Sequence, residues 1–161
     1  MDVDIRSPRP DEAARIKQLA VAANMFDEES VGFFDDILAG FFDGTAQGHA
    51  WLVVPGAGDG LVGAAYYAPE PFADRMWNLY FLAVHPDVQG QGVGQALIEH
   101  VESTLRELGD QTARTLIVET SSTDQYAGTR AFYARRGFVE EARIRQYYGP
   151  DDDKIVFWKQ L

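Results

Sequence analysis

The stretch LAVHPDVQGQGVGQALIEHVE, residues 82–102, constrains the fold of this chain more than any other segment. An apolar run comes first, a glycine-rich turn follows, and apolar residues then recur at helical spacing. Gly90, Gly92 and Gly94 stand in or next to the turn, and the stretch holds no Lys or Arg. Unpaired backbone N–H groups at a helix N-terminus can hold a phosphate without a basic side chain. The segment therefore predicts a strand, an anion-binding turn and a helix.

Composition places the chain among globular proteins of one domain. Its 161 residues, of which 46% are hydrophobic, fit a single domain over residues 1–161. Because there is no cysteine, disulfides, thiolate metal sites and a cysteine nucleophile are excluded together. The N-terminal sequence lacks the apolar core of a signal peptide, and no apolar run reaches the length of a membrane span. We therefore expect a cytoplasmic protein.

The charge is strongly and unevenly negative. A formal net charge of -11 argues against a nucleic-acid binder, which usually carries a basic surface. The stretch from Gln18 through Asp74 has nine acidic residues and no Lys or Arg. It is either a solvated acidic face that favours solubility or the wall of a site that attracts cations.

Hydrophobic periodicity predicts a mixed sheet with helices on both faces. Hairpins come first along the chain, and a strand–helix–strand unit follows. Helices are expected from a cap at Ser7 or Asp11 through residue 23, at 28–42 and 93–108, and from Tyr126 to a stop at Gly137. Strands are expected at 2–6, 49–54, 61–67, 76–84 and 113–121, with two more around a turn at Gly149–Asp153.

Two familiar phosphate-binding patterns do not fit the glycine-rich turn. The Walker pattern requires Gly-Lys-Ser/Thr, and this chain has Gly94-Gln95-Ala96. The dinucleotide pattern G-x-G-x-x-G/A requires a small last residue, and the candidates here are Gln95 and Leu97.

A third pattern fits, and with it the surrounding sequence. Gln89-Gly90-Gln91-Gly92-Val93-Gly94 matches Q/R-x-x-G-x-G/A, and the later segments AFYARRGF and YYGPDDDKIVFWKQL follow in order. Over roughly residues 50–161 the chain resembles the GNAT N-acetyltransferase superfamily, which is acetyl-CoA-dependent. The resemblance implies a single-domain α/β fold, with a mixed six- to seven-stranded sheet flanked by about four helices.

The resemblance also implies a set of cofactor contacts. The backbone of Leu82, Ala83 and Val84 would pair with the pantetheine arm of coenzyme A. The pyrophosphate would be held by the main-chain N–H groups of Gln89, Gly90, Gln91, Gly92, Val93, Gly94 and Gln95. Tyr126 stands where the family often has an Asn that contacts the cofactor arm, and its hydroxyl could donate a similar bond.

Two residues are candidates for the acid and the base. Tyr133 matches the family's usual general acid, although a core aromatic is the alternative interpretation. If its neighbour Phe132 packs into the core, the Tyr133 ring would sit at the boundary. Many members carry a Glu before the loop, where this chain has Asn78-Leu79-Tyr80. Glu119 is the best substitute base, or else a solvated acid or a hydrogen-bond partner for nearby loops.

These observations predict transfer of an acetyl group from acetyl-CoA to a primary amine by direct attack. The expected acceptor is a small cationic amine, and the expected partners include no nucleic acid, membrane or metal ion. A protein or peptide N-terminal acetyltransferase and a non-catalytic acyl-CoA sensor are the alternatives. A monomer and a homodimer are both compatible with the sequence.

Overall fold

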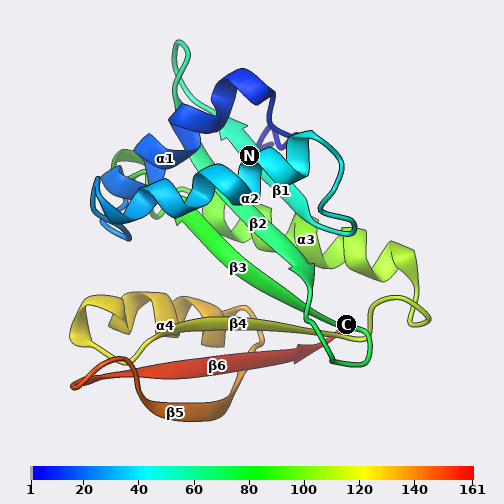
Figure 1. Cartoon of the computed structure of the whole chain (residues 1–161). Helices are drawn as coiled ribbons and strands as arrows, with labels where there is room; N and C mark the ends of the chain where they lie inside the picture. The colour runs from blue at the N-terminus through cyan, green and yellow to red at the C-terminus, as the bar shows by residue number, and fades with distance from the viewer. Residues whose placement is uncertain (1) are drawn as a thin grey trace. The chain divides into compact units, whose positions relative to one another are not determined.

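The computed structural model describes residues 2–161, which form two compact units. Of the described residues, one unit comprises 2–68 and 81–103, and the other comprises 69–80 and 104–161. The described residues contain four α-helices: α1 (Ala13–Ala22), α2 (Phe34–Phe42), α3 (Val93–Leu108) and α4 (Ala127–Arg135). The strands are β1 (Ala50–Pro55), β2 (Leu61–Pro69), β3 (Met76–Val84), β4 (Thr115–Ser121), β5 (Val139–Gly149) and β6 (Asp152–Gln160) (Figure 1). The boundaries between the units fall inside β2, inside β3 and inside α3.

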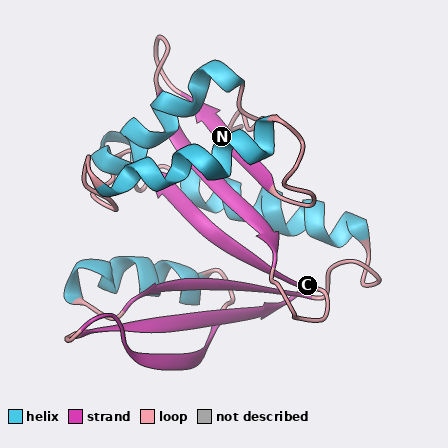
Figure 2. Cartoon of the chain, in the orientation of Figure 1, coloured by secondary structure: helices cyan, strands magenta, loops and turns pink. Residues whose placement is uncertain are grey.

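The six strands have the order β1-β2-β3-β4-β6-β5, and the sheet is mixed. β1 and β2 form an antiparallel hairpin, β3 and β4 are parallel, and β6 lies antiparallel to both β4 and β5 (Figure 2). The predicted α/β class and the mixed sheet are thereby confirmed. No helix within residues 2–161 is both long enough and apolar enough to span a bilayer.

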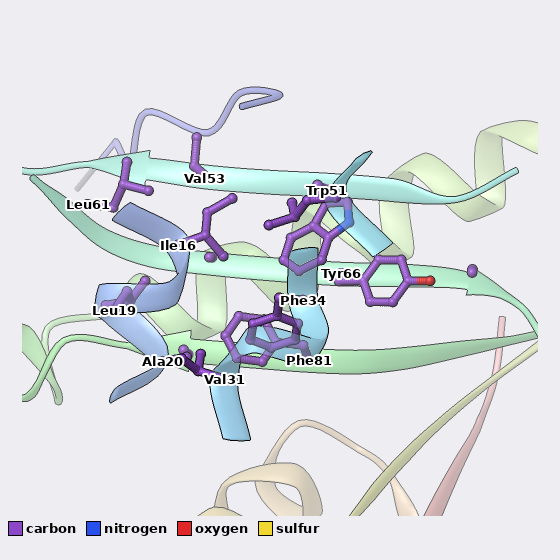
Figure 3. Close-up of a cluster of buried hydrophobic side chains, with 14 residues drawn as sticks. Ile16, Leu19, Ala20, Val31, Phe34, Trp51, Val53, Leu61, Tyr66 and Phe81 are labelled. Carbon is purple, nitrogen blue, oxygen red and sulfur yellow. The ribbon is translucent and has the colours of Figure 1, made fainter. Parts of the chain in front are cut away.

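The first unit is built around an aromatic core. α1 and α2 contribute buried residues such as Ile16 and Phe34, which pack with buried residues of β1, β2 and β3 (Figure 3). Trp51 stacks on Tyr66 with ring centroids 4.6 Å apart, and Phe34 meets Phe81 edge to face at 5.0 Å. Aromatic pairs in these geometries stabilise a core beyond their buried area.

The N-terminal segment differs from the sequence expectation. The predicted strand over residues 2–6 is wrong, because only Arg6 pairs, in an isolated bridge to Val53. The predicted caps at Ser7 and Asp11 are also wrong. A 3-10 turn, Pro10–Glu12, precedes α1, whose N-cap position is Glu12. The turn is fixed by Glu12, whose carboxylate is buried against two arginines.

The second unit places α4 on one face of the strands β4 and β6. Val118 pairs with Phe157 in register, and both are buried, whereas their neighbours Glu119 and Val156 are less buried. Because side chains alternate along a strand, Val118 and Phe157 share one face, and Glu119 lies on the other. The Tyr133 ring of α4 contacts Phe157, so α4 covers the Val118–Phe157 face.

Candidate active site

The glycine-rich turn lies in the first unit, between β3 and α3, and its backbone conformation depends on glycine. Gly90 has φ +79° and Gly92 has φ +91°, values that residues with a side chain rarely adopt. A Cβ on either glycine would meet no other atom within 4 Å. The turn is exposed from Gln89 to Gly92. Glycine is therefore required at these two positions by the backbone conformation and not by lack of space.

The amides that follow the turn are those expected of an anion site. The bond from the Ala96 N–H to the Gly92 carbonyl, 3.0 Å long, closes the first turn of α3. The N–H groups of Val93, Gly94 and Gln95 precede it, at the end of the helix where backbone donors lack helical acceptors. With the positive end of the helix dipole added, a turn of this kind can attract an anion without a basic side chain.

Neighbouring contacts hold the turn in place. The Gln89 Nε2 donates to the Val84 carbonyl at 3.1 Å, and the His85 N–H donates to the Val62 carbonyl at 2.8 Å. A Cβ on Gly63 of β2 would lie only 2.8 Å from the Val93 Cγ1. Gly63 therefore allows α3 to begin directly against β2, a packing role that no local sequence pattern indicates.

The strand before the turn carries the three residues expected to pair with the cofactor arm. Ala83 is buried, and Leu82 and Val84 are half-buried. They lead directly into the turn at His85. Their role toward a ligand stays a prediction.

The candidate base, Glu119, belongs to a polar cluster in the second unit. The Asn78 Nδ2 donates to the Glu119 Oε1 at 2.6 Å and to the Glu70 Oε2 at 3.0 Å. The Tyr80 hydroxyl donates to the same Glu70 oxygen at 2.8 Å. Asn78 is fully buried, and its Oδ1 has no hydrogen-bond partner among the described residues. Positions 78–80 hold no acidic residue, and the fold brings two carboxylates to Asn78 from other segments.

Lys154 of β6 completes this cluster. Its Nζ forms an ion pair with the Glu119 Oε2 and lies 3.8 Å from the centroid of the Tyr147 ring. The Lys154 side chain is 13% exposed and that of Glu119 is 18% exposed. Burial lowers the pKa of Lys154, and the Glu70 carboxylate acts in the opposite direction. Of the alternatives for Glu119, the structure favours a partnered carboxylate over a freely solvated one.

Tyr133, the candidate acid, is buried at one end of α4. Its ring packs against Phe132, Phe138 and Phe157 with centroid distances of 5.6–5.8 Å. The expected placement is reversed, because Phe132 is half-buried and Tyr133 is 5% exposed. Burial raises the pKa of the Tyr133 phenol above its ordinary value of 10.0, so the group holds its proton at neutral pH.

Tyr133 and Glu119 do not meet in the second unit, because they lie on opposite faces of β4 and β6. An acid and a base that serve different atoms of a reaction need no mutual hydrogen bond. Tyr126 lies in a 3-10 turn, Asp124–Tyr126, just before α4, and is half-buried. Burial, together with the charge of Asp152, raises the pKa of Tyr126.

Several polar side chains near α4 form hydrogen bonds to the backbone. Arg130 donates to the carbonyls of Ser121 and Thr123, at 2.7 and 2.8 Å. The Ser122 hydroxyl accepts a hydrogen bond from the Asp153 N–H. Within residues 2–161 no group of three or more His, Asp or Glu side chains could hold a metal ion.

The sequence of this chain is similar to those of known acetyltransferases. The acetyltransferase (GNAT) domain family matches residues 46–140, more than half of the chain. The ribosomal protein bS18-alanine N-acetyltransferase of Escherichia coli K12 is 40% identical over 76 residues. That match covers 47% of this chain and 47% of the relative, so it spans about half the length of each protein.

Solved structures agree over nearly the whole chain. A GNAT-family protein from Desulfovibrio desulfuricans has a TM-score of 0.87 and 30% identity, and 99% of each chain is covered. An aminoglycoside 6'-N-acetyltransferase complexed with coenzyme A has a TM-score of 0.74 at 16% identity, covering 98% of this chain and 96% of its own. The turn, the strand order and the family match agree, and this chain belongs to the GNAT acetyltransferase family.

Proposed function

We propose that this chain is an N-acetyltransferase that moves an acetyl group from acetyl-CoA to a primary amine, with a small cationic amine as the acceptor. The observation that carries the proposal is the pair of carboxylates, Glu70 and Glu119, joined by the buried amide of Asn78. A carboxylate that is held in place can both attract an ammonium ion and take its proton. The excess of acidic residues from Gln18 through Asp74 supports a cationic acceptor.

The donor's binding site would be the turn before α3. Backbone N–H groups from Gln89 to Gln95 would hold the pyrophosphate, and the strand Leu82–Val84 would pair with the pantetheine arm. The open space around Gly90 and Gly92 supports this assignment, because an anion can approach the backbone there. Acetyl-CoA supplies the acetyl group as a thioester, which an amine can attack directly.

The residues of the second unit would move the protons. Glu119 would accept a proton from the acceptor's ammonium group, which leaves a neutral nitrogen able to attack the acetyl carbon. A C–N bond forms and the C–S bond breaks. The nitrogen, which becomes positively charged on attack, loses its second proton to water, so that a neutral amide remains. Tyr133 would donate its proton to the departing sulfur, since its phenol is protonated at neutral pH, and its phenolate would then regain a proton from solvent.

A second candidate is acetylation of a protein N-terminus. It is favoured by the 40% identity, over 76 residues, to a ribosomal protein bS18-alanine N-acetyltransferase. A neutral α-amine needs the same donor site and the same proton acceptor. The two candidates therefore differ only in the molecule that carries the amine, a small cation or a polypeptide.

The test is thiol release from acetyl-CoA with spermidine, an aminoglycoside and a peptide that begins with alanine, each at low and high salt. We expect the highest kcat/KM for a polycation, and a fall in kcat/KM with salt. Preference for the peptide without salt dependence would support the second candidate, and no thiol release with any amine would refute the enzymatic proposal.

A substitution at the proposed base sharpens the test. Glu119→Gln keeps an oxygen that can accept from Asn78 but cannot take a proton. Because general-base assistance is worth about 10²–10⁴-fold, we expect kcat to fall by that order. Glu140→Gln, at an exposed carboxylate on β5, is the matched control and should leave kcat unchanged.

A further inference from the structure

The seat of the Lys154 ammonium group has the chemistry of an ammonium-binding site. A carboxylate of Glu119 pairs with the Nζ on one side, and the face of the Tyr147 ring lies 3.8 Å away. Glu70 is near enough to raise the pKa of this lysine against the effect of burial. A carboxylate and an aromatic face both attract a cation, and both attractions are stronger where the groups are partly shielded from water.

The backbone places Tyr147 over Lys154 by means of an irregularity in β5. The register between β5 and β6 shifts between the pairs Ile144↔Lys154 and Gly149↔Asp152. Gln146, inside the shifted segment, has φ +57°, and its N–H donates to the Asp153 Oδ1 at 2.8 Å. Bulges of this kind re-aim a side chain out of the regular strand pattern. Tyr147 therefore covers the lysine, although the two do not pair in register.

A lysine side chain and a primary-amine acceptor end in the same group. The position beside Glu119, which the proposed function assigns to the acceptor's ammonium, is taken in this structure by the chain's own ammonium. Two ammonium ions cannot share one carboxylate oxygen and one ring face without strong repulsion. The lysine must leave before an acceptor can enter.

We propose that Lys154 is a specificity-determining residue, an internal ammonium group that competes with the acceptor amine for the seat formed by Glu119 and Tyr147. This inference rests on the proposed function for the identity of the acceptor, but the competition itself is a binding property. Only a cation that binds the seat better than Lys154 gains access to Glu119. Neutral amines, and cations that bind Glu119 and Tyr147 more weakly than Lys154 does, are thereby excluded.

The test measures the binding of spermidine by calorimetry and, separately, acetyl transfer to spermidine. Lys154→Met keeps most of the length of the side chain and removes the competing charge. We expect spermidine to bind roughly threefold to thirtyfold more tightly, the range that an ammonium–aromatic contact of this kind is worth. In kinetics the KM for spermidine should fall by a similar factor, with little change in kcat.

The matched control is Lys159→Met, which changes the net charge of the protein by the same amount on the same strand. Lys159 donates to the Arg136 carbonyl and lies 5.5 Å from the Phe138 ring centroid, and strand alternation places it on the other face. Spermidine affinity should change much less in this variant. Equal changes in both variants would reduce the effect to net charge and overturn the proposal.

A second variant tests the contribution of the Tyr147 ring and separates failure of this proposal from failure of the proposed function. In the Lys154→Met background, Tyr147→Leu should weaken spermidine binding, because the ring then serves only the ligand. Unchanged or weaker binding in Lys154→Met would show that the lysine does not compete, even if wild-type protein acetylates spermidine. Tighter binding without acetylation of any amine would instead retain the seat and reject the proposed function.

Discussion

Glu12 should make the stability of the first unit depend on acid pH. Its carboxylate accepts from Arg6 Nη1 and Nη2 at 2.7 and 2.8 Å and from the Arg9 N–H at 2.8 Å. The hydrogen bonds from the Arg6 guanidinium lower the pKa of Glu12 from 4.5 to about 2, against the effect of burial. This contact ties the turn before α1 to the residue that bridges β1.

The magnitude follows from the two pKa values. At about 1.36 kcal/mol per pKa unit, the difference between 4.5 and about 2 corresponds to about 3.4 kcal/mol at neutral pH. Because the pKa is lower in the folded state, this stabilisation is complete well above pH 4.5 and is lost as the pH falls through about 2. At about pH 3, roughly 2 kcal/mol should already be lost. Because the Arg6 side chain is partly exposed and solvent screens its charge, these free energies are upper limits.

The assay is urea unfolding of wild type and Glu12→Gln at about pH 7 and pH 3. We expect the free energy of unfolding of the variant to be lower by about 2–3 kcal/mol at pH 7, and the difference to shrink by about 1–2 kcal/mol at pH 3. Asp11→Asn is the control, because the Asp11 side chain is 66% exposed and makes only an exposed pair with Arg9. The same difference for Glu12→Gln at both pH values would refute the reasoning.

Two further predictions concern the proposed donor site and acid. Gly92→Val should raise the Kd for coenzyme A at least about tenfold, because a β-branched residue cannot keep φ +91°. Gly128→Ala in α4 is the control and should leave the Kd unchanged. Calorimetry measures both, and unaltered binding by Gly92→Val would mean that the turn only connects β3 to α3. Tyr133→Phe keeps the buried ring and removes only the proton donor, so kcat should fall by about 10²–10⁴-fold with little change in the KM for acetyl-CoA. Steady-state kinetics measures both, and a near-normal kcat would leave Tyr133 as a packing residue.

The elements around the glycine-rich turn could be predicted because their causes are local. Positive φ at Gly90 and Gly92 is a property of glycine itself, and the period of Val93, Leu97 and Val101 already predicts a helix with one apolar face. The hairpin of β1 and β2 was predicted from the same kind of pattern, two alternating strands around a turn. The segment over residues 2–6 failed for the opposite reason. Its alternation is typical of a strand, but the fold supplies a partner only at Arg6.

The polar cluster could not be predicted, because its members come from distant parts of the chain. Asn78 gave one signal, a polar residue within an apolar strand, but nothing local shows that its amide would join Glu70 to Glu119. Lys154 reaches Glu119 only because β6 lies antiparallel beside β4. Sequence spacing says nothing about such contacts.

The sequence by itself determined the family, the order of the elements and the backbone chemistry of the turn, because glycine conformation and helical or strand periodicity act over a few residues. Only the tertiary structure decided that Tyr133, and not Phe132, is the buried aromatic, and that Glu119 is partnered by the chain's own lysine. Burial and charge pairing depend on which strands and helices meet. A side chain's neighbours across a sheet are set by the packing of the whole unit, and no local pattern encodes them.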